Sequence, residues 1–106
     1  MSEIVVQLPS RHEFSAVIGS IFNTSTDESG VFEICLVSVD EIVSNEAQEN
    51  FTLLFRAPLD APPHQGIYRL EHEAIGAMDL FLVPVKQDDS GLYYEAVFNL
   101  LKAAAA

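Results

Sequence analysis

The side chains best suited to catalysis or metal binding in this chain are three histidines and one cysteine. The histidines are His12, His64 and His72, and the cysteine is Cys35. Their spacing matches none of the familiar zinc-binding patterns of histidine and cysteine. The sequence also has no glycine-rich phosphate loop, no Gly-x-Ser-x-Gly nucleophile elbow and no metalloprotease helix. We therefore predict no catalytic residue, no metal and no cofactor, and expect that the protein is not an enzyme.

One run of ionisable residues, Glu71-His72-Glu73, has the composition of a metal site. Side chains alternate along a strand, so His72 points away from both glutamates and the three do not close on one ion without a bend. We expect His72 to end a hairpin and to hydrogen-bond the backbone of the turn. Cys35 lies mid-strand with Glu33 on its own face, which weakens it as a nucleophile. We expect Cys35 to be a small core residue.

A proline-rich loop between two predicted strands has polar residues near its ends. Arg56 precedes Pro58, and Gln65 follows Pro62 and Pro63. An isolated arginine leaving an apolar strand needs a partner, so we expect Arg56 to pair with an acidic side chain or to brace the carbonyls of the loop. The two candidate acidic partners are Glu95 and Asp79. We favour bracing over substrate binding, and predict that Arg56, Gln65 and His72 brace the loops.

Length, charge and composition limit the classes of protein to consider. The chain has 106 residues, 49 % of them hydrophobic, which fits one folded domain over residues 1–102, followed by an alanine tail over residues 103–106. Five basic and 16 acidic residues give a net charge of 5 − 16 = −11. Such a charge repels nucleic acid and anionic membranes, and no apolar run approaches the roughly 20 residues of a spanning helix. We expect a soluble cytoplasmic protein, because the single cysteine forms no internal disulfide and the N-terminus lacks the features of a secretory signal.

Periodicity predicts one short helix followed by strands. Ser10 and Glu13 have the spacing of a capping box, which favours a helix over residues 10–18 ending at Gly19, with Phe14, Val17 and Ile18 facing inward. A long first strand over residues 14–22 is the alternative. Alternating β-branched and aromatic residues then predict six strands. We place them at residues 20–25, 31–39, 51–56, 67–72, 77–85 and 92–100.

The connections indicate how these strands are arranged. Residues 40–50 are acidic and polar, so we interpret them as a loop, and the other connections are mostly short and polar, which implies antiparallel neighbours. We predict a mainly β fold, a six-stranded antiparallel meander forming a small barrel or a tight sandwich. The helix would plug one end or lie over an open side. Pro84 cannot donate to a ladder, so its strand is expected to be an edge strand or bulged.

The strands carry more apolar side chains than one buried face requires. Leu54, Phe81 and Val83 lie in segments that are apolar on both faces, and Pro84 adjoins them. Leaving several such groups in water would forfeit about 1.5 to 3 kcal/mol each. The helix and loops of the same chain are one possible cover. A protein partner or a second copy is the other, and we predict an interaction surface at these residues.

Four segments, in this order, resemble a small bacterial domain family of unknown function. They are Phe51-Thr52-Leu53-Leu54-Phe55-Arg56-Ala57-Pro58, Gln65-Gly66-Ile67-Tyr68-Arg69-Leu70-Glu71-His72, Phe81-Leu82-Val83-Pro84-Val85 and Tyr93-Tyr94-Glu95-Ala96-Val97-Phe98-Asn99. Ala57 departs from the glycine that is usual there. Genes of the family often lie near those of phage-tail-like proteins, so the resemblance implies a structural or assembly role and no catalytic residue.

Taken with the apolar surplus, the resemblance leads us to expect a non-enzymatic interaction or assembly module, accessory to a phage-tail-like structure. A small-molecule-binding β-barrel is the alternative, and an internal cavity of roughly 300 Å³ or more would favour it.

Overall fold

A computed structural model describes residues 9–26, 30–44 and 48–101 of the chain as one helix and six strands. The predicted alanine tail, residues 103–106, lies outside the described residues. The elements are α1 (Arg11–Ser15), β1 (Ile21–Ser25), β2 (Phe32–Ser44), β3 (Gln48–Ala57), β4 (Gly66–His72), β5 (Gly76–Asp88) and β6 (Gly91–Leu101).

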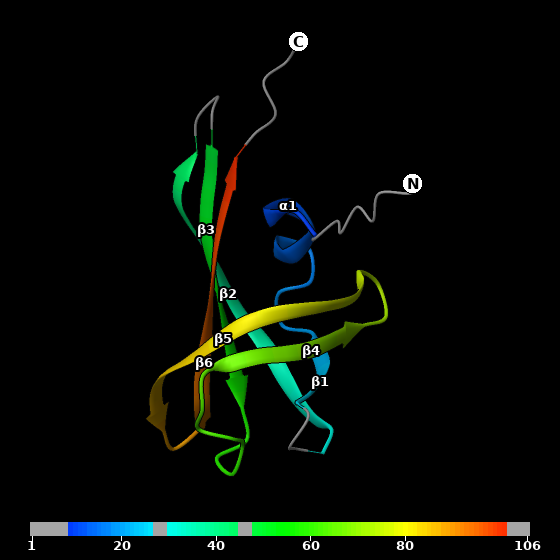
Figure 1. Cartoon of the computed structure of the whole chain (residues 1–106), viewed down its shortest axis with the longest axis vertical. Coiled ribbons are helices and arrows are strands. Elements are labelled where there is room, and N and C mark those ends of the chain that lie inside the picture. Colours follow the sequence, from blue (N-terminus) through cyan, green and yellow to red (C-terminus); the bar gives the residue numbers. More distant parts are fainter. Residues whose placement is uncertain (1–8, 27–29, 45–47, 102–106) are drawn as a thin grey trace, which may run out of the picture.

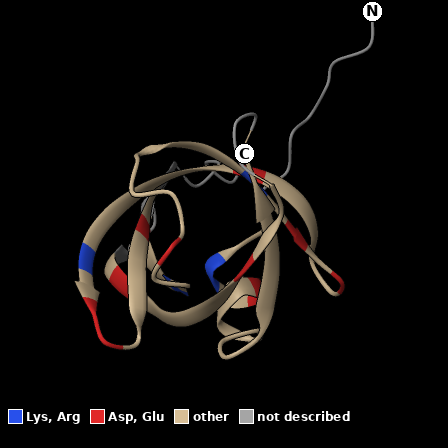
Figure 2. Ribbon diagram, turned by 90° about the horizontal axis from the view of Figure 1, so that it is seen from below, with Lys and Arg blue, Asp and Glu red and all other residues tan. Residues whose placement is uncertain are grey.

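The six strands are all antiparallel and close into a ring in the order β1-β2-β3-β6-β5-β4 (Figure 1). This confirms the mainly β fold and the barrel-like closure. The ring consists of two three-stranded meanders, β1-β2-β3 and β4-β5-β6, joined where β3 pairs with β6 and β1 with β4. The strand order therefore differs from that of one continuous meander. Viewed end-on, the strands surround a common interior, and acidic residues occur at several places around it (Figure 2).

The barrel interior is filled by one face of every strand. Inward positions alternate with outward ones, as the pleat requires, and the inward side chains are almost completely shielded from water. They include Phe22, Ile34, Leu36, Phe51, Leu53, Phe55, Tyr68, Leu70, Leu80, Leu82, Tyr94 and Phe98. Thr24 is the buried polar side chain among the described residues, and its hydroxyl has no hydrogen-bond partner there.

Helix α1 begins as the sequence predicts and ends earlier. The Ser10 hydroxyl accepts a hydrogen bond from the Glu13 backbone, and the Glu13 carboxylate accepts one from the Ser10 backbone, which completes the capping box. Phe14 is fully buried and packs on Phe51 and Phe98, with ring centroids 6.3 and 5.5 Å away. The helix stops at Ser15, so the prediction that Ile18 faces inward is wrong; that side chain is 47 % exposed.

The interpretation of residues 40–50 as a loop is also wrong. Strand β2 continues to Ser44 and β3 begins at Gln48, with Val39 opposite Leu53 and Glu41 opposite Phe51. Asp40 is opposite Thr52 on the outer, solvated face, and Glu41, on the same face as Phe51, forms an ion pair with Arg11 at 3.1 Å. The acidic composition of this stretch therefore did not exclude a strand. Proline-containing β5 is bulged, with a register shift between Pro84 and Lys86. At Pro84 it pairs only with β6, because its ladder with β4 ends at Leu82, so the strand has a free edge on that side at the proline.

Candidate functional site

An apolar surface covers the outer face of the ring where β3, β6, β5 and β4 lie side by side. Ile67 on β4 is directly opposite Phe81 on β5, and both point outward, 62 % and 51 % exposed. Val97 on β6 is 55 % exposed. Two half-buried side chains, Leu54 and Val83, lie on the same outer face. We call these five residues, Leu54, Ile67, Phe81, Val83 and Val97, the outer patch.

The strand register explains why these residues share one surface. Glu95 on β6 is opposite Leu54 on β3 and also opposite Val83 on β5, so the three form one row across the sheet. Val97 follows two positions later on the same face of β6, about 7 Å along the strand. Pro84, which was predicted to belong to the surface, is half-buried beside the bulge. Phe81 is 51 % exposed and no described part of the helix or loops covers it, so apolar surface of the kind expected from the sequence is present there.

A second row borders the outer patch and carries two cations. Arg56 on β3 and Lys86 on β5 lie on either side of Tyr93 on β6, and the Lys86 Nζ sits 4.5 Å from the centre of the Tyr93 ring. The expected pairing of Arg56 with Asp79 is absent, because Asp79 pairs with Arg69 at 3.3 Å. Among the described residues, Arg56 also has no ion pair with Glu95. Its exposed guanidinium is therefore available to solvent or to a partner.

The proline-rich loop is held by two tyrosines. The Tyr94 and Tyr68 rings pack 5.2 Å apart; the Tyr94 hydroxyl donates to the Pro62 carbonyl and the Tyr68 hydroxyl to the His64 carbonyl. Burial raises the pKa of the Tyr94 phenol. The hydrogen bond and the electrostatic interaction with the Tyr68 phenol raise that pKa further. Arg56 and Gln65, predicted as loop braces, are exposed, and neither side chain forms a hydrogen bond within the described part of the chain.

His72 joins the β4–β5 turn to the segment after α1. The Ala74 backbone N–H donates to the Nδ1 atom of His72 at 2.9 Å, so the proton of the neutral ring is on Nε2. Nε2 lies 2.8 Å from the Ser20 hydroxyl, which in turn donates its own hydrogen to the Val17 carbonyl. The ring also packs on Phe22, with centroids 4.6 Å apart.

This hydrogen-bond direction is opposite to that of a serine nucleophile and its general base. In a catalytic pair the serine donates to the imidazole, and a carboxylate orients the other ring nitrogen. Here the imidazole donates to the serine, and a backbone amide occupies the other nitrogen. The arrangement stabilises the chain locally and does not activate Ser20.

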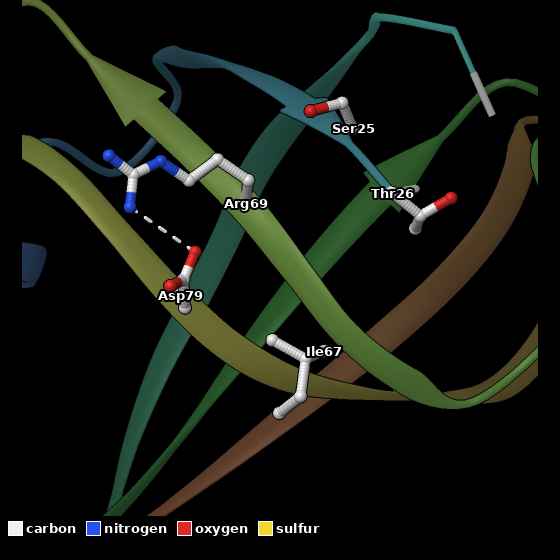
Figure 3. A pocket seen from close by; sticks show the side chains of 5 residues that line it. All are labelled: Ser25, Thr26, Ile67, Arg69 and Asp79. Atoms are coloured by element: carbon white, nitrogen blue, oxygen red, sulfur yellow. Dashed lines mark hydrogen bonds and ion pairs between the residues drawn. The ribbon is translucent and has the colours of Figure 1, made fainter. Parts of the chain in front are cut away.

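Two hollows lined by described residues lie on the outside of the ring. One of about 470 Å³ is lined by Ser25, Thr26, Ile67, Arg69 and Asp79, and the exposed Arg69–Asp79 ion pair crosses it (Figure 3). Another of about 310 Å³ is lined by Asn23, Glu33, Glu71, His72 and neighbouring residues. No group of three or more metal-ligating side chains occurs among the described residues. Both hollows are open surface features, unlike the enclosed barrel cavity that a small-molecule carrier requires.

Sequence reasoning found part of this surface and missed part of it. Leu54, Phe81 and Val83 were predicted from their apolar neighbours on both faces, and all three belong to the outer patch. Ile67 and Val97 were missed; their signal was an apolar residue at an outward position of an otherwise alternating strand. Ser20 was missed as the partner of His72, since 52 residues separate them and no local pattern links them. Cys35, expected in the core, is half-buried on the outer face opposite Arg56.

The fold and this surface define a small, closed antiparallel β-barrel with a filled interior and an apolar outer face. The chain belongs to the family described as Domain of unknown function (DUF6916), whose model matches residues 9–98. This match confirms membership of a domain family of unknown function, as the sequence motifs indicated. No curated protein and no solved structure matches the chain. Within the described residues there is no helix with both the length and the apolar character needed to cross a membrane.

Proposed function

We propose that this protein is a non-enzymatic interaction module that binds a protein partner through the outer patch. The observation that carries the proposal is the exposure of Ile67, Phe81 and Val97, each more than half accessible on adjoining strands. Apolar side chains gathered in this way on a small protein are characteristic of binding surfaces. An assembly role in a phage-tail-like particle, acting in the cytoplasm, is the setting that the motif resemblance favours for such a module.

The rim of the patch supports a protein partner more than a small ligand. Phe81 and Ile67 form an exposed apolar pair on neighbouring strands, and Glu95, Arg56 and Lys86 provide charges beside it. Protein interfaces typically combine an apolar centre with a polar rim. Small ligands instead favour concave pockets that bury most of their surface. The patch has the first arrangement.

Capture from the cells that naturally produce the protein tests this function. Wild-type protein and the double variant Ile67→Lys, Phe81→Lys are immobilised and exposed to the same lysate. We expect the double variant to capture at least about tenfold less of a partner that the wild type binds, because the two substitutions place two cations at the apolar centre.

Ile18→Lys is the matched control, because Ile18 is exposed to a similar degree and lies outside the patch. Binding that survives in this control and disappears in the double variant assigns the partner to the outer patch. Equal capture by the wild type and the double variant contradicts the proposal.

A further inference from the structure

Among the described residues, no strand pairs with one edge of β6 over its second half. The ladder between β5 and β6 ends at the pair Val83 and Glu95. Beyond this point β5 pairs only with β4, while β6 continues beside β3 as far as Leu101. Figure 1 shows the separation, with β6 running up beside β3 and β5 turning away across the barrel. Within the part of the chain that the structure describes, residues 96–101 therefore present an open edge of backbone N–H and C=O groups.

This edge lacks the features that usually protect exposed strands. Natural edges carry charged residues, prolines or bulges that prevent another chain from pairing with them. Strand β2, at the opposite side of the same sheet, has Asp40 and Glu41 and a bulge beside them. Residues 96–101 of β6 read Ala-Val-Phe-Asn-Leu-Leu, with no charge and no proline, and their register with β3 is unbroken.

The open edge and the outer patch adjoin each other. Val97 belongs to both, and Phe81 lies on the outer face of β5, the strand that separates from β6 there. A strand added to β6 would pair its backbone with residues 96–101 and place alternate side chains on the outer surface beside Val97 and Phe81. On the inner side, Phe14 of α1 already packs on Phe98, so the barrel interior remains closed.

Charge indicates which kind of segment fits. The whole chain carries a net charge of −11, and the carboxylate at the point of separation is Glu95, which is half-buried and has no ion pair among the described residues. Arg56 and Lys86 lie in the adjoining row, on the side away from the open edge. An approaching segment with basic residues is attracted by the whole molecule and has a specific acceptor at Glu95.

We propose that the edge of β6 at residues 96–101 binds an extended segment of a protein partner as an added strand, and that this segment alternates apolar residues with Lys or Arg. Its backbone pairs with β6, its apolar side chains contact Val97 and Phe81, and one of its cations pairs with Glu95. This inference rests on the proposed function and names the conformation and chemistry of the partner segment.

Selection from a phage-displayed library of random linear peptides, with the whole chain as target, tests the proposal. Sequences enriched on the wild type are expected to alternate apolar residues with Lys or Arg. The synthetic peptide made from the most enriched sequence is then bound to the wild type, and amide hydrogen exchange is measured by NMR. Exchange of the edge amides in residues 96–101 should slow by about tenfold or more, because added-strand hydrogen bonds protect them.

Three variants separate the parts of the proposal. Val97→Lys places a charge on the edge and should weaken binding of the peptide by at least about tenfold. Ile42→Lys changes a similarly exposed β-branched residue on β2 and should leave peptide binding unchanged. Glu95→Lys should redirect a repeated selection toward Asp and Glu. Unchanged chemical shifts elsewhere in each variant confirm the fold.

The alternative results are distinct. Peptides that bind the outer patch without protecting the edge amides would overturn strand addition while leaving the proposed function intact, and a selection without basic residues would overturn the pairing with Glu95. If the edge amides are already protected from exchange in the free protein, another part of this chain occupies the edge and the proposal is overturned. If that protection rises with protein concentration, the edge is occupied by a second copy of the chain. A target that enriches no peptide at the patch would overturn both proposals.

Discussion

Gly91 lies so close to the neighbouring strand β3 that a side chain does not fit there. It begins β6, and a β-carbon built there would lie 2.2 Å from the Ala57 carbonyl oxygen and 3.1 Å from the Cγ atom of Arg56. The first of these atoms belongs to the backbone of β3, so relief requires the strands to separate. We expect Gly91→Ala to lower the free energy of unfolding by about 1 to 3 kcal/mol, measured by urea denaturation.

Gly66→Ala is the matched control, because no heavy atom lies within 4 Å of its β-carbon position. Its effect should stay within about 0.5 kcal/mol. Equal losses in the two variants would show that the close approach of Gly91 to β3 does not limit the fold.

Ionisation of Tyr94 should lower the stability of the protein at alkaline pH. The folded-state pKa of Tyr94 is raised above the ordinary value of 10.0, so its contribution to stability is fully present below about pH 10 and is lost as the pH rises through the folded value. Near pH 7, Tyr94→Phe should be less stable by about 1 kcal/mol, since the hydrogen bond to Pro62 is lost.

Above pH 10 this difference should shrink, because the variant has no phenol to ionise at this position. Urea denaturation of both proteins from pH 7 to 11 measures how the difference in their unfolding free energies changes with pH. A constant difference across that range would mean that Tyr94 ionisation does not couple to folding.

At the scale of elements, α1 contacts the barrel through the ring of Phe14 and through an ion pair between Arg11 and Glu41 of β2. Phe14 is fully buried against Phe51 and Phe98, whereas Ile18, beyond the end of the helix, remains accessible. Phe14→Ala should therefore cost about 3 to 5 kcal/mol of unfolding free energy, and Ile18→Ala less than about 1 kcal/mol. Thermal unfolding compares them, and similar losses would restore the inward position that the sequence suggested for Ile18.

The elements show how far local patterns extend. The spacing of Ser10 and Glu13 predicted the start of α1, since a capping box depends on residues three positions apart. Alternation together with β-branched and aromatic residues between turn formers predicted the six strands, because these signals are contained in the sequence of each strand. The stretch from Asp40 to Ser44 was misjudged because Asp40 is exposed on the outer face of a strand and Glu41 pairs with Arg11, and such a composition resembles that of a loop.

Pairing between distant strands lies beyond such patterns. Short connections identified β1–β2, β4–β5 and β5–β6 as neighbours, but the loop from Pro58 to Gln65 is compatible with β4 lying beside either β3 or β1. The contacts of His72 with Ser20 and of Tyr94 with Pro62 depend on that choice, so they could not be inferred. The outer patch was partly predictable because apolar residues on both faces of a strand require a second cover.

The apolar outer surface and the acidic charge have opposite effects on self-association of the whole molecule. With the interior occupied, the outer patch remains apolar and accessible, whereas mutual repulsion at a net charge of −11 opposes association between copies of the chain near neutral pH. That repulsion vanishes near the sequence pI of about 4.3. Apolar surfaces are then free to associate.

We therefore expect light scattering to show a maximum of self-association near pH 4.3 that reverses on return to pH 7. The double variant Ile67→Ser, Phe81→Ser should reduce this maximum several-fold, because it removes the apolar centre of the outer patch while leaving the charge unchanged. Ile18→Ser, which also leaves the charge unchanged, should not reduce it. If all three proteins scatter equally at this pH, association arises from the loss of charge alone, and the outer patch is not the adhesive surface of the molecule.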